Sequence, residues 1–141
     1  MRKMDEAEWR AFLQTGARTA KCATVRANGR PHIAPVWFLL KEGDIWFTTW
    51  HESVKAKCLQ RDPRLALCVE DDRPPFSYVS VDGRAEFVDD AAQLLGVATE
   101  LGGRYMGTGR ADDFGRRNAV PGELLVRVRI ERVIGFADVS A

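Results

Sequence analysis

Residues 21–50, KCATVRANGRPHIAPVWFLLKEGDIWFTTW, carry the pattern that decides the fold. The segment contains three runs rich in the β-branched and aromatic residues that favour strands: Lys21–Arg26, His32–Leu40 and Ile45–Trp50. Between the first two runs stands Asn28-Gly29, a dipeptide that readily takes the positive φ angles of a tight hairpin turn. The second run is largely apolar from Ala34 onward, which indicates a strand covered on both faces. The segment therefore predicts a meander of three strands.

One helix is predicted before this segment and another directly after it. Asp5, with Glu8 three residues later, forms a capping box, and the apolar residues that follow repeat at helical spacing until Gly16. After the third strand, Ser53 is a good N-cap for a short helix over residues 54–60. The meander is thus expected to have one helix before it and one helix after it in the sequence.

The second half of the chain predicts three more strands, over residues 65–70, 77–88 and 124–130. Gly83, near the middle of the longest of them, is expected to mark a bulge or bend. Asp89 or Asp90 caps a further helix, and the glycine-rich stretch 102–117 is predicted to be a loop. Six strands joined mostly by short turns predict a mostly β fold with flanking helices, a small six-stranded barrel forming one domain over residues 1–141.

Composition limits the classes of function. The chain has 141 residues and a formal net charge of +1, from 21 basic and 20 acidic side chains, so the basic surplus typical of nucleic-acid binding is absent. The longest apolar run, residues 34–40, is too short to cross a membrane. The three cysteines form an odd set without a C-x-x-C pair, which favours a reduced, cytoplasmic protein. His32 and His51 lie in different elements, so no metal site is predicted.

The strand-to-helix junction Thr48-Thr49-Trp50-His51-Glu52-Ser53-Val54-Lys55-Ala56-Lys57 is a candidate anion site. The first N–H groups of a helix lack partners and attract anions. Lysines are disfavoured at that positive end of the helix dipole, so two of them there make sense if an anion sits between them. The alternative interpretation, a serine cap beside two solvated lysines, stays open on spacing alone.

Aromatic and proline residues mark a second candidate surface. Pro35-Val36-Trp37 lies in the middle of the apolar strand, where flat apolar side chains are able to receive an aromatic ring system. Phe76 and Tyr78 follow the Pro74-Pro75 turn. The alternative for all of these side chains is that they fill the barrel.

The order and spacing of several segments resemble the pyridoxamine-phosphate-oxidase-like proteins, and within them the short flavin and deazaflavin oxidoreductases. The resemblance covers the chain from about Thr15 to Phe136 and rests on the segments 22–32, 35–38, 53–64, 81–86 and 130–135. It implies a split β-barrel homodimer with two cofactor sites at the subunit interface. The chain departs from the members that oxidise pyridoxamine phosphate, because those are longer and carry extra basic residues for the substrate phosphate.

The resemblance also implies roles for particular residues. Positions that hold the cofactor phosphate correspond to Thr48, Thr49, Ser53, Val54, Lys55 and Lys57. The strand along the ring system corresponds to Pro35, Val36 and Trp37, and positions near the ring or the substrate correspond to Phe76 and Tyr78. The implied cofactor is coenzyme F420, with FMN as the alternative, and no catalytic residue is assigned.

Three functions are compatible with these residues. The first is an F420H2-dependent reductase that transfers a hydride to a planar conjugated small molecule. The second is an FMN-dependent oxidoreductase of the same fold, and the third is a non-catalytic protein that binds a flavin or a tetrapyrrole. Because F420 carries a phosphodiester and an acidic glutamate tail, the first also predicts a basic path, for which Lys57, Arg61 and Arg64 share one face of the short helix.

Overall fold

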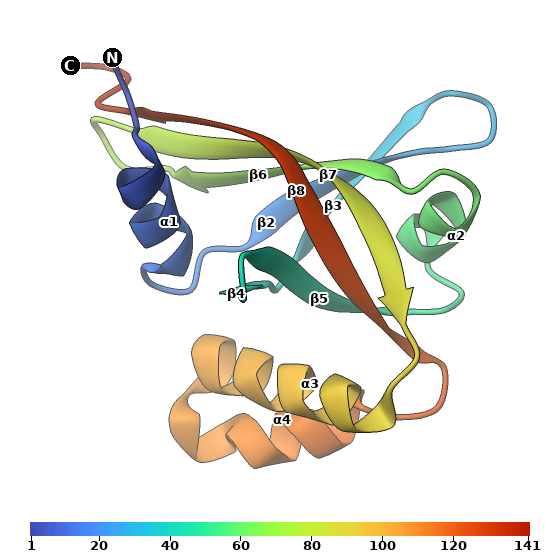
Figure 1. Ribbon diagram of the computed structural model, residues 1–141. Helices are drawn as coiled ribbons and strands as arrows, with labels where there is room; N and C mark the ends of the chain where they lie inside the picture. The colour runs from blue at the N-terminus through green and yellow to red at the C-terminus, as the bar shows by residue number, and fades with distance from the viewer.

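The computed structural model describes residues 1–141 as one mostly β structure with helices around a sheet that closes on itself (Figure 1). Its elements in chain order are β1 (Arg2–Lys3), α1 (Glu6–Gln14), β2 (Ala20–Val25), β3 (Pro31–Val36), β4 (Leu39–Lys41), β5 (Asp44–Trp50), α2 (Val54–Arg61), β6 (Arg64–Asp71), β7 (Ser77–Val88), α3 (Ala91–Met106), η1 (Thr108–Arg110), α4 (Ala111–Asn118) and β8 (Glu123–Ala137).

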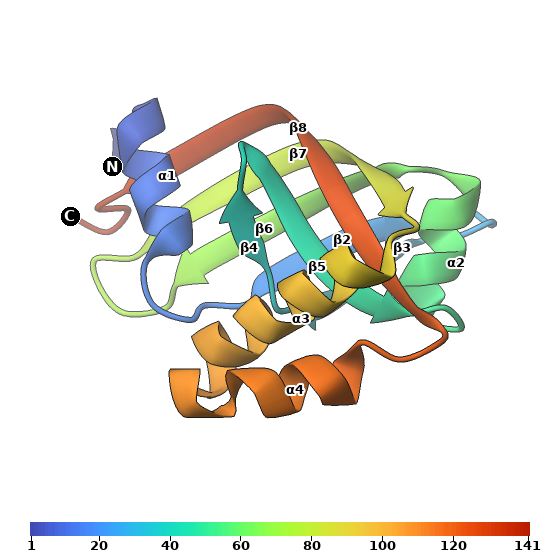
Figure 2. The ribbon, with the colours of Figure 1, turned by 60° about the horizontal axis from the view of Figure 1, so that its bottom comes forward.

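The strand order explains how the sheet becomes a barrel. The antiparallel path runs β3-β2-β6-β7-β8-β5-β4, and β1 pairs with β8 beside it. The two strands at the ends of this path, β3 and β4, are consecutive in the chain and separated only by Trp37 and Phe38. The barrel is therefore closed by one bent strand, whose first half pairs with β2 and whose second half pairs with β5. Figure 2 shows β4 and β5 crossing in front of β2, β6 and β7.

The predicted barrel is present, but it has eight strands rather than six. The two additional strands arise because the predicted strand 32–40 is divided in two at Trp37-Phe38, and because Arg2–Lys3 pairs with the end of β8. The predicted meander holds only in part, since β5 meets the divided strand at β4 alone and pairs with β8 on its other side. A long strand must bend when a small sheet closes. The run of apolar residues did not indicate at which residue this strand would bend.

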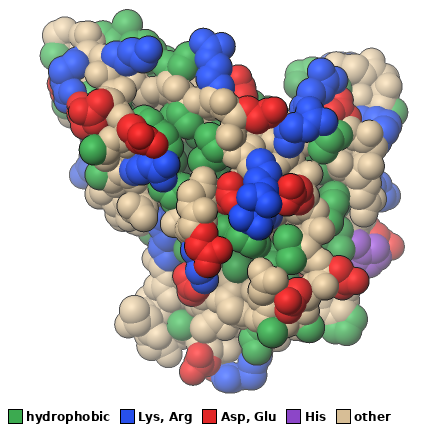
Figure 3. Space-filling view, in the orientation of Figure 1, with side chains coloured by type: hydrophobic (Ala, Val, Ile, Leu, Met, Phe, Trp, Pro, Cys, Tyr) green, Lys and Arg blue, Asp and Glu red, His purple; other side chains and the backbone are tan.

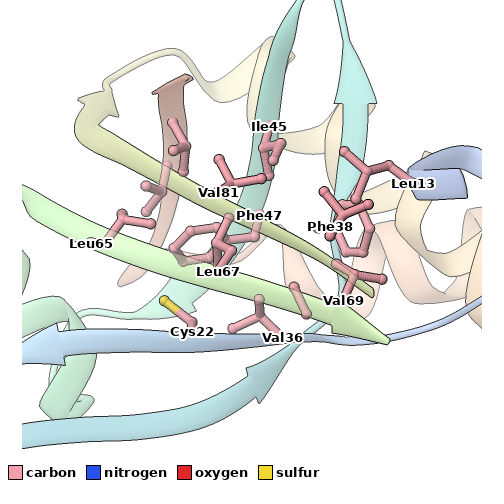
Figure 4. Close-up of a cluster of buried hydrophobic side chains, with 14 of the residues drawn as sticks. Leu13, Cys22, Val36, Phe38, Ile45, Phe47, Leu65, Leu67, Val69 and Val81 are labelled. Atoms are coloured by element: carbon pink, nitrogen blue, oxygen red, sulfur yellow. The ribbon is translucent and has the colours of Figure 1, made fainter. Parts of the chain in front are cut away.

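The barrel interior is filled by side chains that alternate inward along the strands. Figure 4 shows part of this core, in which side chains from several strands meet Leu13 of α1. The prediction that both faces of residues 34–40 are covered is wrong at Pro35, which is exposed, and the neighbouring Ile33 side chain is 67% exposed. The largest fully buried side chains are Phe38, Phe47, Leu13, Ile45, Leu67, Leu125, Val69, Val79, Val81, Val126 and Val128.

The bend between β3 and β4 is held by two side chains from α3. The Tyr105 hydroxyl accepts from the Phe38 N–H at 3.1 Å and donates to the Arg18 carbonyl at 2.8 Å. The Arg104 guanidinium donates to the Phe38 and Leu13 carbonyls, both at 2.7 Å, and so joins the bend to α1. Backbone groups freed by the break in strand pairing are thus satisfied by side chains, as buried polar groups must be.

Residues 102–117 are helical except at Gly107, so the predicted loop is wrong. The glycines there allow close helix packing: a Cβ on Gly102 would lie 2.6 Å from Phe114 Cβ, and one on Gly115 would lie 2.1 Å from Thr99 Oγ1. In sequence, glycine indicates a loop because it weakens an isolated helix. Here α3 and α4 approach closely enough that only glycine fits between them. The other local predictions are confirmed: the Asp5 capping box, the Ser53 and Asp90 caps, and a bulge at Gly83.

The helix contact makes a testable prediction with an internal control. Gly115→Ala should lower the free energy of unfolding by roughly 1–3 kcal/mol, because the new methyl group has to displace Thr99 in a packed contact. Gly96→Ala should instead raise it by roughly 0.5–1 kcal/mol, since nothing lies within 4 Å of a Cβ there and alanine favours a helix. Urea denaturation of both variants measures this difference. Equal effects at the two positions would contradict the packing explanation.

Candidate functional site

The candidate site lies where the barrel wall is not paired. β3 pairs with β2 only, and β5 pairs with β8 and β4, so no strand pairing joins β3 to β5. Helix α2 follows β5 and packs against β2, β3 and β5 at this split, as Figure 1 shows at the right of the molecule. The N-terminus of α2 is therefore positioned beside an unpaired strand edge, whose free N–H and C=O groups are available to a ligand.

The end of β5 and the start of α2 bring three polar side chains together. The Thr49 and Ser53 hydroxyls share a hydrogen bond of 2.8 Å, and Lys55 Nζ donates to Thr49 Oγ1 at 3.3 Å. Ser53 Oγ also accepts from the Ala56 N–H at 3.1 Å, which is the predicted N-cap. Neither Lys55 nor Lys57 has a carboxylate partner within salt-bridge distance in the structure. Hydroxyls, helix N–H groups and an uncompensated ammonium group suit a phosphate.

Lys55 is linked to side chains of three strands: it donates to Thr49 on β5, and its charge acts on His32 and Cys22. Burial, and then the charges of Arg26 and Lys55, lower the pKa of His32 on β3. Burial raises the pKa of Cys22 on β2 to about 11, and Lys55 opposes that shift. The Lys55 ammonium group therefore lies among β2, β3 and β5, at the split.

Two buried polar atoms beside this charge have no partner. His32 Nδ1 and Thr24 Oγ1 make no hydrogen bond, although Thr24 is only 1% exposed and the two residues are paired across β3 and β2. Leaving a buried polar atom unsatisfied costs about 1–3 kcal/mol. Such atoms fit a region that acquires a polar ligand, and sequence reasoning gave His32 no role.

The other predicted phosphate-binding residues point elsewhere. Thr48 lies on the opposite face of β5 from Thr49, and its hydroxyl donates to Glu123 Oε2 at 2.9 Å. Val54 and Lys57 are exposed on α2, and Lys57 does not share a helix face with Lys55, two residues earlier. The structure thus joins Thr49, Ser53 and Lys55 directly, while Thr48 meets a carboxylate that sequence reasoning did not identify.

The carboxyl group of Glu123 is half-buried. Burial raises its pKa, while the hydrogen bond from Thr48 and the charge of Lys55 lower it. Glu123 begins β8 directly after the Pro121-Gly122 turn and pairs in register with Trp50 at the end of β5, and no pattern in the sequence marked it. It brings a negative charge into the neighbourhood of Lys55.

The three predicted ring-contacting residues of the apolar strand separate in the structure. Val36 lies in the barrel core. The Trp37 ring stacks on Tyr105 with a centroid distance of 5.0 Å and an interplanar angle of 3°. Only Pro35 has an exposed side chain, and it lies three residues along β3 from His32. A ring at this strand would therefore meet its free backbone edge and Pro35 rather than the Trp37 side chain.

Phe76 and Tyr78 lie at the other end of the barrel from Ser53. Tyr78 pairs with Phe136, whereas Val88, at the far end of β7, pairs with Leu125, which is opposite Thr48. Ten residues of strand correspond to roughly 30 Å along β7. Phe76 is 41% exposed and has a φ of 60°, which is uncommon for a residue with a side chain. Within a single chain, Phe76 and Tyr78 therefore lie far from the anion site.

The predicted basic path along α2 is altered by local pairing. Arg64 forms two hydrogen bonds to Asp62, of 3.0 and 2.8 Å, and Arg61 donates to the carbonyl of Val25, which adjoins the turn of the β2–β3 hairpin. Arg26 and Arg30 at the tip of this hairpin have no carboxylate partner within salt-bridge distance in the structure and line a small surface hollow with Asn28. In Figure 3, Lys and Arg side chains gather on the projecting arm at the upper right, where Figure 1 places the hairpin. The arginines without a carboxylate partner therefore lie along the hairpin rather than along α2.

The chain belongs to the pyridoxamine 5'-phosphate oxidase family, whose family model matches residues 5–136. This match confirms the resemblance found in the sequence and agrees with the closed, mostly β architecture. A comparison with curated proteins found no match. No helix in the structure has both the length and the apolar character needed to cross a membrane.

Solved structures with the same fold have varied descriptions. The conserved hypothetical protein Rv2991 from Mycobacterium tuberculosis is 31% identical, with a TM-score of 0.84 over 96% of this chain and 86% of that one. A protein described as an F420 reductase is 24% identical, with a TM-score of 0.66 over 86% of this chain and 93% of the other. HutZ, described as a heme storage protein from Vibrio cholerae, is 21% identical, with a TM-score of 0.71 over 91% and 92%. The last two likenesses show the fold alone.

Proposed function

We propose that the protein is an F420H2-dependent reductase that transfers a hydride to a planar, conjugated small molecule. The observation that carries this proposal is Lys55, an ammonium group without a carboxylate partner, which meets Thr49 at the N-terminus of α2 beside an unpaired strand edge. This arrangement suits a phosphate at one end of a flat cofactor. The family, which includes oxidoreductases, supports the oxidoreductase class, and the choice of F420 is the finer proposal.

The residues present fit such a cofactor. Lys55, Ser53 and Thr49 would hold its phosphate with the first N–H groups of α2, and the unpartnered polar atoms of Thr24 and His32 lie beside that position. The free edge of β3 near Pro35 would orient the ring system through backbone hydrogen bonds. When bound, reduced F420 supplies a hydride to an electron-poor double bond. The chain itself supplies binding, orientation and exclusion of water, and no side chain is assigned as an acid or base.

A second copy of the chain would complete the site. The outward side of the sheet, here called the outer sheet face, carries small and apolar side chains around the charged Lys21 and Asp82. They are Ala23, Ile33, Pro35, Ala66, Cys68 and Ser80. An exposed patch of this kind marks an interface, and small residues allow two sheets to approach closely. Phe76 and Tyr78 would then reach the anion site from the second copy, because they lie far from it within one chain. We therefore propose a homodimer with closed two-fold symmetry.

The choice between F420 and FMN is tested by titrating the cofactor-free protein with each, read by fluorescence. We expect F420 to bind more tightly, because its glutamate tail adds contacts with basic side chains such as Arg26 and Arg30. That advantage should shrink as salt is raised from 0.01 to 0.5 M, values chosen to shorten the screening length from roughly 30 Å to a few Å. Tight, salt-insensitive FMN binding with weak F420 binding would favour the FMN-dependent alternative. Tight binding without turnover of any acceptor would favour a non-catalytic binding protein.

A further inference from the structure

We infer that the junction of β7, α3 and β8 is a second binding site, which takes a small amphiphilic cation: an alkyl- or arylammonium ion with an apolar body. This inference goes beyond the proposed function and does not depend on it. None of the residues that the sequence assigned to a cofactor or a substrate lines this junction. Its test therefore succeeds or fails separately from the titration with F420.

A hollow of about 440 Å³ opens where β7 ends, α3 begins and the chain returns from α4 into β8. Both ribbon views place these segments close together at the right of the molecule (Figures 1 and 2). Small-molecule sites have volumes of roughly 300–1,000 Å³ and mostly apolar walls. Here Leu125 is buried, Val88 and Leu94 are half-buried beside it, and Phe87 and Val120 are exposed at the rim. An apolar ligand body would cover this surface.

The charged side chains that line the hollow are all acidic. They are Asp89, Asp90 and Glu123, and no lysine, arginine or histidine lines it. Asp90 is already used as the cap of α3, since it accepts from the N–H groups of Ala92 and Gln93. Asp89 and Glu123 have no basic partner within salt-bridge distance in the structure. Two carboxylates are therefore left for the head group of a cation.

Glu123 is the carboxylate that would orient the ligand. The Thr48 hydroxyl donates to its Oε2 at 2.9 Å, which fixes the side chain and leaves Oε1 without a protein partner. Because side chains alternate along β5, Thr48 and Glu123 lie on the opposite side of the strand pair from Thr49. The carboxylate is half-buried, and a carboxylate that is poorly solvated gains most from an opposite charge in contact with it.

The end of α4 adds to the negative potential of the hollow. This helix ends at Asn118, and its C-cap, Ala119, lines the hollow. The last carbonyl groups of a helix lack partners within it and form the negative end of the helix dipole. Carboxylates, a helix C-terminus and an apolar base together favour a ligand with a cationic head and an apolar body. An anion of the same shape would be repelled.

The test uses three probes that differ only in their head group: phenylbutylamine, phenylbutanol and phenylbutyrate. Each is titrated into the isotope-labelled full-length protein at about pH 8, well below the pKa of roughly 10.4 of an alkylammonium group. Amide shifts in a two-dimensional NMR spectrum locate the bound probe and give its Kd. We expect the largest shifts at Leu94, Val120 and Glu123. The amine should bind roughly tenfold more tightly than the alcohol, and the acid more weakly than both.

Two variants test the carboxylates, and a third is the control. Glu123→Gln keeps an acceptor for Thr48 and should reduce the advantage of the amine over the alcohol to less than about threefold. Asp89→Asn, at an exposed position, should reduce it less. Glu42→Gln changes the net charge equally at the opposite end of β5, outside the hollow, and should leave the advantage unchanged. Thermal unfolding of each variant confirms that folded proteins are compared.

Several outcomes would overturn the inference. Equal binding of amine and alcohol would show an apolar hollow without a cation site. The same conclusion would follow if Glu123→Gln and Asp89→Asn both left the advantage of the amine unchanged. Shifts confined to residues outside the hollow, or no shifts up to about 10 mM amine, would show that the probe does not bind there. Broadening of the hollow's amide signals as protein concentration rises would show that a second copy covers it instead.

Discussion

Replacing Lys55 by alanine should weaken cofactor binding by ~1–3 kcal/mol, which corresponds to a rise in Kd of roughly 5- to 150-fold. Lys55 is the ammonium group that donates to Thr49, whose hydroxyl is hydrogen-bonded to Ser53 at the N-terminus of α2, and its loss would remove the charged hydrogen bond to the phosphate. Folding stability should change little, because the lysine makes no ion pair that the variant would break. Fluorescence titration with F420 measures the binding, and thermal unfolding measures the stability.

The matched control is Lys57→Ala. Lys57 lies two residues further along the same helix but is exposed and points away from Thr49. Its removal should change affinity only through long-range attraction, by less than about threefold at moderate salt. Unchanged affinity in the variant lacking both lysines would show that no phosphate binds at the start of α2.

Replacing Ile33 by glutamate should convert the proposed dimer into monomers that bind cofactor poorly. Ile33 is 67% exposed on the outer sheet face, in the edge strand β3, next to Ala23 in register. Two copies packed on this face would bury two such carboxylates without partners, each at a cost of several kcal/mol. Light scattering at micromolar concentration gives the mass, and titration with F420 gives the affinity.

The control for that variant is Leu95→Glu, a similar change at an exposed apolar position of α3, away from the outer sheet face. It should leave both the dimer and the affinity intact. A monomer for the unchanged protein, with full cofactor affinity, would count against the shared site. So would a dimer that survives Ile33→Glu.

Local signals in the sequence predicted the elements that depend on local interactions. The Asp5 capping box, the Ser53 cap and the exact span of β7, with its bulge at Gly83, could all be predicted because capping and bulge formation involve near neighbours in the chain. The grouping of Thr49, Ser53 and Lys55 was predictable for the same reason, since these residues lie within one strand-to-helix junction.

Features that depend on distant contacts could not be predicted in this way. Gly102 and Gly115 indicated a loop because nothing in their own neighbourhood reveals that two helices meet there. Glu123 reaches Thr48 across a separation of 75 residues. Trp37 was expected to face a ring system, but its neighbour Tyr105 lies in a helix much later in the chain. In each case the missing information is the identity of a partner that only the fold brings near.

The hydrogen bonds at the bend between β3 and β4 have a consequence for the order of folding. Phe38 is held by Arg104 and Tyr105, residues that a ribosome adds 66 and 67 positions later. A nascent chain that ends before α3 can form the β2–β3 hairpin, but it lacks the groups that hold the bent strand in place. Such contacts between distant residues carry a large loop-closure cost. Closure of the barrel should therefore be a late event in biosynthesis. In fragments truncated before residue 104, the Phe38 amide hydrogen should exchange freely with solvent.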